Sequence, residues 1–94
     1  MSSIWTMGEL LVEIMRPHAD MPHDVAGEYL GPYPSGAPAI FIDTVARLGI
    51  NAGIIGGVGT DGFGENLLRR LKKDGVILSH VLQLKEGSTA VAFV

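Results

Sequence analysis

Three parts of the sequence carry residue types that could bind or transform a ligand. The first is a carboxylate, Glu13, which follows the first predicted strand and could accept hydrogen bonds from hydroxyl groups. The second is the predicted helix start at Ser35-Gly36-Ala37, where free backbone N–H groups can hold hydroxyl or anionic oxygens. The third is a glycine-rich turn, residues 57–62, with the G-x-G-x-x-G spacing of dinucleotide-binding loops. Each signal is weak by itself, because solvated carboxylates, helix starts and tight turns are common.

The glycine-rich turn, GVGTDG, lies between a predicted strand and a predicted helix, as a dinucleotide-binding loop does. Two requirements of such a site are missing. The loop should follow the first strand of its βαβ unit, yet a strand and a helix precede it here. The acidic ribose ligand should follow about 20 residues later, and residues 77–84 contain none. We therefore interpret residues 57–62 as a structural turn, and a small dinucleotide-binding domain is a less favoured alternative function.

Metal-ligand residue types gather in the polar segment that follows the second strand, at His18, Asp20, His23 and Asp24. We predict no metal site there, because a loop lacks the fixed geometry and the outer hydrogen bonds that orient metal ligands. The sequence contains no cysteine, which excludes disulfides and thiolate sites. It shows no nucleophile–base pattern either, so we assign no catalytic residue to this chain.

Composition excludes several classes of protein. The 94 residues fit one domain or a piece of one, and the formal net charge of −3 comes without a basic block. Nucleic-acid binding requires clustered Lys and Arg, so it is not expected. No stretch approaches the roughly 20 apolar residues of a membrane helix, and the N-terminus does not have the pattern of a signal peptide. We expect a cytoplasmic protein, and the 47% hydrophobic content predicts apolar surface that contacts a neighbour.

Hydrophobic periodicity predicts an α/β fold. Residues 52–58 have no polar side chain, which is typical of a strand inside a parallel sheet. Helix, glycine and strand follow one another twice, which is the alternation of an α/β sheet. The last predicted strand has no turn after it, so we expect the domain to continue beyond Val94. The predicted strands are residues 4–8, 10–15, 28–34, 52–58, part of 76–84, and 89–94, and the predicted helices are residues 35–48 and 62–74.

Local signals also predict how each helix begins and ends. Ser35 and Asp61 are side chains that can cap the first turns of the two helices. Gly49 and Gly75 suit the positions directly after the helix ends. On the first helix, Asp43 and Arg47 are spaced four residues apart, which predicts a weak ion pair.

Several short motifs follow one another along the chain. Taken together, their order is specific enough to indicate a protein family. They are Gly8-Glu9, Glu13, Ser35-Gly36-Ala37-Pro38-Ala39, Ala46-Arg47-Leu48-Gly49, Gly56, Val58-Gly59, Asp61, Gly64, Leu67-Leu68, Lys73, Gly75-Val76 and Thr89-Ala90-Val91-Ala92-Phe93. In this arrangement the chain resembles the N-terminal part of the PfkB/ribokinase family of carbohydrate kinases.

The resemblance implies a ribokinase-like α/β fold, with a mostly parallel sheet flanked by helices and a small β lid. Residues 1–94 would be the N-terminal segment of one such domain, with lid strands at about residues 9–34 and 89–94 inserted in the α/β core. The implied reaction transfers the γ-phosphate of ATP to a sugar hydroxyl. ATP and Mg²⁺ are the implied cofactors, and the family places their site and the catalytic base downstream of this segment.

The resemblance also implies a sugar site that includes Glu13 and the predicted helix start at Ser35-Gly36-Ala37. Its substrate-binding positions correspond to Glu13, Ser35, Gly36, Ala37 and Ile40. The family usually has a second glycine where Ser35 stands and an asparagine where Ile40 stands. The implied partner is a small-molecule sugar, and a homodimer through the lid is left open. The alternative function is a non-catalytic binding or oligomerisation module derived from the kinase fold.

Overall fold

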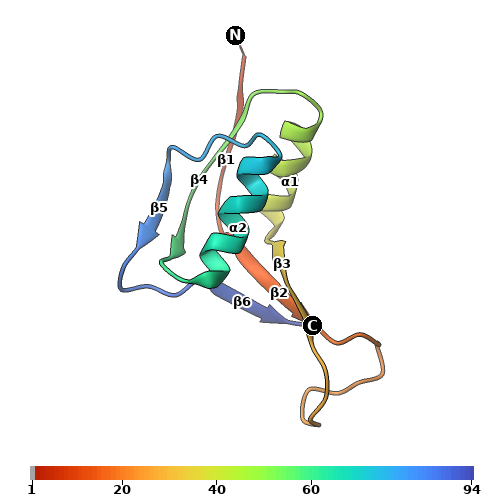
Figure 1. The fold of residues 1–94 in the computed structure, drawn as a ribbon. Helices are drawn as coiled ribbons and strands as arrows, with labels where there is room; N and C mark the ends of the chain where they lie inside the picture. The colour runs from red at the N-terminus through yellow and green to blue at the C-terminus, as the bar shows by residue number, and fades with distance from the viewer. Residues whose placement is uncertain (1) are drawn as a thin grey trace.

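The computed structural model describes residues 2–94, which form six strands and two helices (Figure 1). In chain order these are β1 (Ile4–Met7), β2 (Leu11–Met15), β3 (Leu30–Ser35), α1 (Ala37–Arg47), β4 (Ala52–Gly59), α2 (Gly62–Lys73), β5 (Val81–Leu84) and β6 (Ala90–Phe93). Each predicted helix and strand is therefore present, with ends that differ by a few residues.

The strands form two separate sheets. The first has the order β1-β4-β5, and all of its strands are parallel. The second has the order β3-β2-β6, in which β2 pairs antiparallel with β3 and parallel with β6. We call this second sheet the lid sheet. Figure 1 shows it at the opposite end of the molecule from the N-terminus, with the segment between β2 and β3 projecting beyond it.

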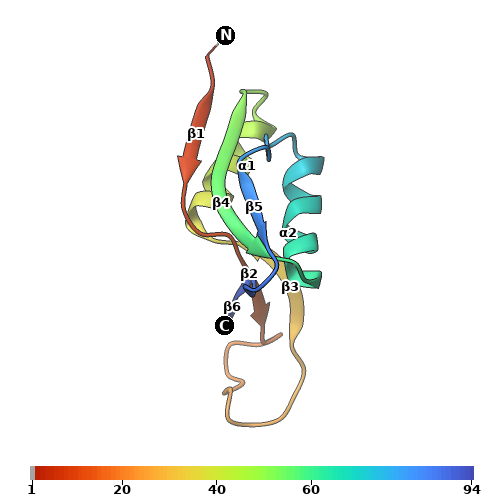
Figure 2. The same ribbon diagram turned by 90° about the vertical axis from the view of Figure 1, so that its left-hand side faces the viewer.

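Both helices pack on one face of the β1-β4-β5 sheet (Figure 2). Alternate residues of β4, namely Ala52, Ile54 and Val58, point toward the helices and are buried at 2% exposure or less. The opposite face has no helix from the described residues. Its apolar side chains remain open to solvent, with Trp5 and Ile55 each 39% exposed.

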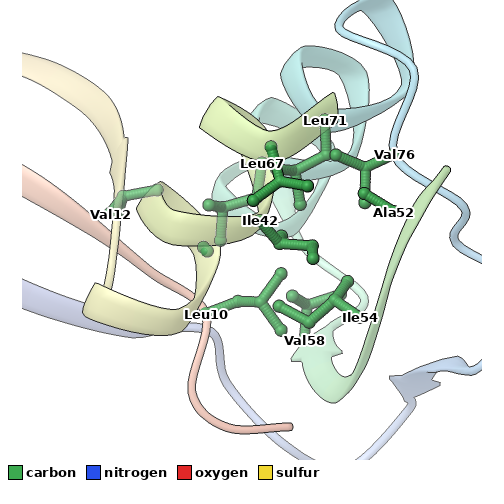
Figure 3. Packing of buried hydrophobic residues seen from close by; sticks show 11 residues of the cluster. Leu10, Val12, Ile42, Ala52, Ile54, Val58, Leu67, Leu71 and Val76 are labelled. Carbon is green, nitrogen blue, oxygen red and sulfur yellow. The ribbon is translucent and has the colours of Figure 1, made fainter. Parts of the chain in front are cut away.

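A single hydrophobic core joins the two sheets (Figure 3). Leu10 and Val12, from the segment that enters the lid sheet, are 2% and 0% exposed. They belong to the same buried cluster as Ile42 of α1 and Leu67 of α2. The lid sheet is thus held against the helices by apolar contacts, which fixes its position relative to the start of α1.

The helix ends follow the predicted signals. Gly49 and Gly75 have φ angles of 87° and 93°, a conformation that glycine adopts without the steric cost of a side chain. Asp61 is the N-cap of α2, as predicted. Neither helix of the described chain is long and apolar enough to cross a membrane.

Replacement of Leu67 by alanine tests the shared core. Leu67 has no exposed surface, so Leu67→Ala should lower the free energy of unfolding by about 2–5 kcal/mol through lost burial and the cavity left behind. Leu48→Ala is the matched control, because Leu48 is 73% exposed and its loss should change stability by about 0.5 kcal/mol or less. Urea denaturation followed by circular dichroism measures both. Equal losses in the two variants would contradict a core that links the helices to the lid sheet.

Candidate functional site

The start of α1 differs from the prediction in one informative way. Ser35 does not cap the helix; the N-cap is Gly36, and no side chain of residues 2–94 hydrogen-bonds to this helix start as a cap. Ser35 is instead the last residue of β3, so its side chain is fixed by strand pairing with β2. Its hydroxyl donates to Oε1 of Glu13 at 2.8 Å. The prediction was wrong because the strand extends one residue further than the sequence indicated.

Glu13 and Ser35 are therefore brought together from positions 22 residues apart. The pairing of Leu11 with Ser35 and of Glu13 with Tyr33 places both side chains on one face of the lid sheet. Ser35 is 5% exposed, whereas Glu13 is only half-buried. The buried hydroxyl holds a carboxylate that still reaches solvent, as a ligand-binding group must.

Gly36 brings its backbone close to the segment that precedes β2. Its φ angle is 99°, and a Cβ atom at this position would lie 2.8 Å from the carbonyl oxygen of Glu9. A larger residue would thus meet both backbone strain and a steric clash. Glycine at position 36 allows α1 to begin directly beside the Glu13–Ser35 pair.

The remaining predicted site residues lie in the first turn of α1. Ala37 is the first helical residue and is exposed. Ile40 donates its backbone N–H to the carbonyl of Gly36 at 2.9 Å, while its side chain is 54% exposed. Ser35 and Ile40 also line one pocket of about 190 Å³ between α1 and α2, which Glu13 does not line.

The glycine-rich turn is organised by a single carboxylate, that of Asp61. Its Oδ1 accepts from the backbone N–H of Gly64 at 2.8 Å and from the hydroxyl of Thr89 at 2.7 Å. Its Oδ2 accepts from the backbone N–H of Thr89 at 2.9 Å. The same Thr89 hydroxyl accepts from the N–H of Gly59 at 3.0 Å. The network joins the end of β4, the start of α2 and the approach to β6.

The chain's own atoms lie close against two glycines of this region, Gly59 in the turn and Gly64 in the first turn of α2. A Cβ atom on Gly59 would lie 2.5 Å from Oδ2 of Asp61 and 2.7 Å from the backbone N of Thr89. A Cβ atom on Gly64 would lie 2.3 Å from the carbonyl oxygen of Gly59. These two glycines therefore allow close contact within the chain, which is the structural role predicted for this turn. A carboxylate at the helix start would also repel an anion.

Hydrogen bonding keeps Asp61 ionised. Bonds from the backbone of Thr89, from the backbone of Gly64 and from the Thr89 hydroxyl lower the pKa of Asp61 below its ordinary value of 3.8. Sequence reasoning identified the cap but not Thr89, which is 28 residues away. No local pattern links a capping residue to a distant threonine, although Thr89 does belong to the motif set that suggested the family.

The polar segment between β2 and β3 is ordered by Arg16. Its guanidinium donates to the carbonyl oxygens of Pro22, Val25 and Glu28 and lies 3.9 Å from the ring centroid of Tyr29. His23 stacks on the same Tyr29 ring, with its Nδ1 3.1 Å from the Tyr29 hydroxyl. Within residues 2–94, no three His, Cys, Asp or Glu side chains are placed to hold a metal ion.

Residues 1–94 match the model of the pfkB family carbohydrate kinases. The chain belongs to this family. Within the pfkB family it is 34% identical over 93 residues to a fructokinase from Escherichia coli, a match that covers 99% of this chain and 28% of the fructokinase. It is 44% identical over 62 residues to a 5-dehydro-2-deoxygluconokinase from Geobacillus kaustophilus, covering 65% of this chain and 18% of that enzyme.

Solved structures of pfkB-type kinases share the fold. A candidate ribokinase II from E. coli, crystallised in complex with ATP and Mg²⁺, superposes with a TM-score of 0.97 at 51% identity and covers all of this chain and 30% of its own. An uncharacterized sugar kinase from Pyrococcus horikoshii gives a TM-score of 0.91 at 31% identity, over 99% of this chain and 30% of its own. The ribokinase-like α/β fold is thus confirmed, and the chain spans less than a third of these relatives.

Acid unfolding should report on the Asp61 network. Because the folded-state pKa of Asp61 lies below 3.8, its stabilising contribution is complete above that pH and is lost as the pH falls through the folded-state value. Asp61→Asn should therefore be less stable than the natural chain at pH 7, and this difference should shrink as the pH falls from about 4.5 to 2.5.

Thermal unfolding followed by circular dichroism over this pH range measures the difference. Asp24→Asn serves as the control, because Asp24 is an exposed loop residue whose replacement should leave the acid dependence unchanged. A stability gap between Asp61→Asn and the natural chain that stays constant from pH 4.5 to 2.5 would contradict the role of the carboxylate.

Proposed function

We propose that this chain is the sugar-binding part of an ATP-dependent carbohydrate kinase that transfers phosphate to a sugar hydroxyl. The observation that carries the proposal is the Glu13–Ser35 hydrogen bond of 2.8 Å at the uncapped start of α1. It combines a hydroxyl-binding carboxylate with a helix start that has free N–H groups. Membership of the pfkB family supports the same reading.

The proposed site suits a polyhydroxylated ligand. A sugar hydroxyl can donate its proton to the Glu13 carboxylate and accept from a backbone N–H at Gly36 or Ala37. Ser35 holds Glu13 in place without neutralising it, since a hydroxyl donates one hydrogen bond and leaves the charge intact. The site also lies beyond the carboxyl end of β1, the edge at which open α/β sheets bind ligands.

We further propose that residues 1–94 form a segment of one ribokinase-like domain, with the lid strands within residues 9–34 and 89–94. Two observations support this division. Strands β2, β3 and β6 pair only with one another, apart from the parallel sheet. Val12 of the lid sheet nevertheless belongs to the common core, so the lid sheet is part of the same folding unit.

ATP and Mg²⁺ belong to the proposed reaction, but the residues described here do not fit them. At the turn of residues 57–62 the Asp61 carboxylate caps the start of α2 and would repel a phosphate, and the described residues bring together no cluster of three acidic or histidine side chains for a metal ion. ATP, when bound, supplies the phosphoryl group, and Mg²⁺ neutralises its charge. We assign both to parts of the family fold that this chain does not span, and we assign the sugar side to Glu13 and the start of α1.

Ile40 should shape what this site accepts. Its side chain stands exposed in the first turn of α1, close to Ser35. An isoleucine cannot donate or accept a hydrogen bond, so a sugar hydroxyl placed against it would stay unpaired. An unpaired polar group costs roughly 1–3 kcal/mol, or about 5- to 150-fold in affinity. We therefore expect ordinary hexoses to bind weakly.

Binding of D-fructose to the 94-residue chain tests the site, with backbone NMR shifts as a readout suited to weak affinity. Glu13→Ala should abolish the shifts at Gly36 and Ala37, because it removes the hydroxyl acceptor. Ile40→Asn should strengthen binding, because it adds an amide where the apolar side chain stands. Glu28→Ala is the control, since Glu28 is an exposed residue outside the site. Unchanged binding in both site variants would mean that the sugar binds elsewhere or not at all.

Phosphoryl transfer by the 94-residue chain alone should be absent. Such catalysis needs positioned phosphates, a base and charge stabilisation, none of which the described residues provide. We expect no ADP release above background from purified chain mixed with ATP, Mg²⁺ and D-fructose or D-ribose. Sugar-dependent turnover that survives repeated purification would overturn the assignment of the catalytic groups to other parts of the family fold.

A further inference from the structure

An acidic contact lies between α1 and α2, apart from the Asp61 network. Asp43 projects from the middle of α1, and Asp74 is the C-cap residue of α2. Asp43 lines a pocket together with Arg70, whose Nε donates to Asp74, and the side chains of Asp43 and Asp74 interact by a hydrogen bond. A hydrogen bond between two carboxyl groups requires a proton on one of them, because two carboxylates offer only acceptors.

The surroundings determine which carboxyl group holds the proton. Oδ2 of Asp74 accepts from Nε of Arg70 at 2.7 Å, which favours the ionised form of Asp74. Oδ1 of Asp43 is buried and has no donor among the residues described. A buried oxygen without a donor is costly when its carboxyl group is charged and less so when it is neutral. Asp43 is therefore the member of the pair that is protonated.

The other charges near Asp43 act too weakly to reverse this order. Arg70 comes from α2 and Arg47 from α1 itself, and both favour the ionised form of Asp43. Burial and the neighbouring Asp74 outweigh them and raise the pKa of Asp43 to about 6. The ion pair between Asp43 and Arg47 predicted from their spacing does not form among the described residues, where Arg70 pairs with Asp74 instead.

We propose that Asp43 and Asp74 share one proton and form a pH-sensitive clasp between α1 and α2. When Asp43 is protonated, it donates to the Asp74 carboxylate and holds the two helices together. When both groups are ionised, they repel each other across the helix contact. The clasp borders the pocket of about 190 Å³ that Asp43 lines together with Ser35 and Ile40.

The sign of the pH dependence follows from the direction of the pKa change. The folded chain binds more protons at Asp43 than the unfolded chain does between its ordinary pKa of 3.8 and about 6. The stabilising contribution of Asp43 is therefore complete below pH 3.8 and is lost as the pH rises through about 6. The contribution of Asp61 to stability changes in the opposite direction, since it is lost as the pH falls, and it changes at lower pH. Above about pH 4.5 the two contributions can therefore be measured separately.

Thermal unfolding of the full chain between pH 4.5 and 7.5 provides the first test. In Asp43→Asn an amide donates to Asp74 at every pH, so the melting temperature of this variant should rise relative to the natural chain as the pH increases. Asp20→Asn is the matched control, because Asp20 is exposed in the loop after β2, and its difference from the natural chain should not change with pH. A difference in melting temperature between Asp43→Asn and the natural chain that stays constant over this pH range would overturn the proposal.

Carboxyl ¹³C NMR of the natural chain supplies a second test that does not depend on the folding of Asp43→Asn. The Asp43 resonance should titrate with a midpoint near pH 6. In Asp74→Asn the midpoint should move toward 3.8, because the repelling charge is gone. An Asp43 midpoint near 3.8 in the natural chain, or a midpoint near 6 that Asp74→Asn leaves unchanged, would show that the two groups do not share a proton.

Discussion

The arrangement of this molecule depends on one carboxylate, that of Asp61, and on the donors that surround it. The side chain satisfies the first turn of α2 through Gly64 and receives both the hydroxyl and the backbone N–H of Thr89. Thr89 directly precedes β6, which pairs with β2, and β2 carries Glu13. The position of Glu13, the proposed sugar-binding carboxylate, thus depends on a hydrogen-bond network at the β6 edge of the lid sheet. Apolar burial of Val12 supports the same placement but lacks the directionality of hydrogen bonds.

The two helix starts have opposite chemistry, and this difference explains where a ligand can bind. At α2, Asp61 accepts from the first turn, and Gly59 and Gly64 let the backbone close on itself. At α1, the N-cap is Gly36, and no side chain described here caps the turn. A helix start that is already occupied cannot serve a ligand, whereas an open one retains donors. The glycine-rich motif at residues 57–62 therefore lies at the helix start that is less suited to binding a ligand, although its sequence matches the spacing of a dinucleotide-binding loop.

Sequence reasoning succeeded where the deciding interactions are local. The cap at Asp61, the glycines after each helix and the apolar face of β4 follow from neighbours a few residues apart. It was wrong about Ser35, whose role depends on strand pairing with β2 rather than on the adjacent helix. It also missed the contacts of Asp61 with Thr89 and of Asp43 with Asp74, which join residues about 30 positions apart. Such contacts depend on how the elements pack, which no spacing rule encodes.

Three acidic side chains show how packing gives one chemical group different roles. Asp61 receives several donors and stays charged, so it can act as a permanent anchor. Asp43 is buried against a second carboxyl group, so its charge depends on pH near neutrality. Glu13 accepts a single hydrogen bond from the buried Ser35 hydroxyl and still reaches solvent, which leaves it able to bind a further hydroxyl. The number of donors around each carboxyl group, rather than its place in a motif, is the feature that distinguishes the anchor from the proposed switch and the proposed ligand-binding group.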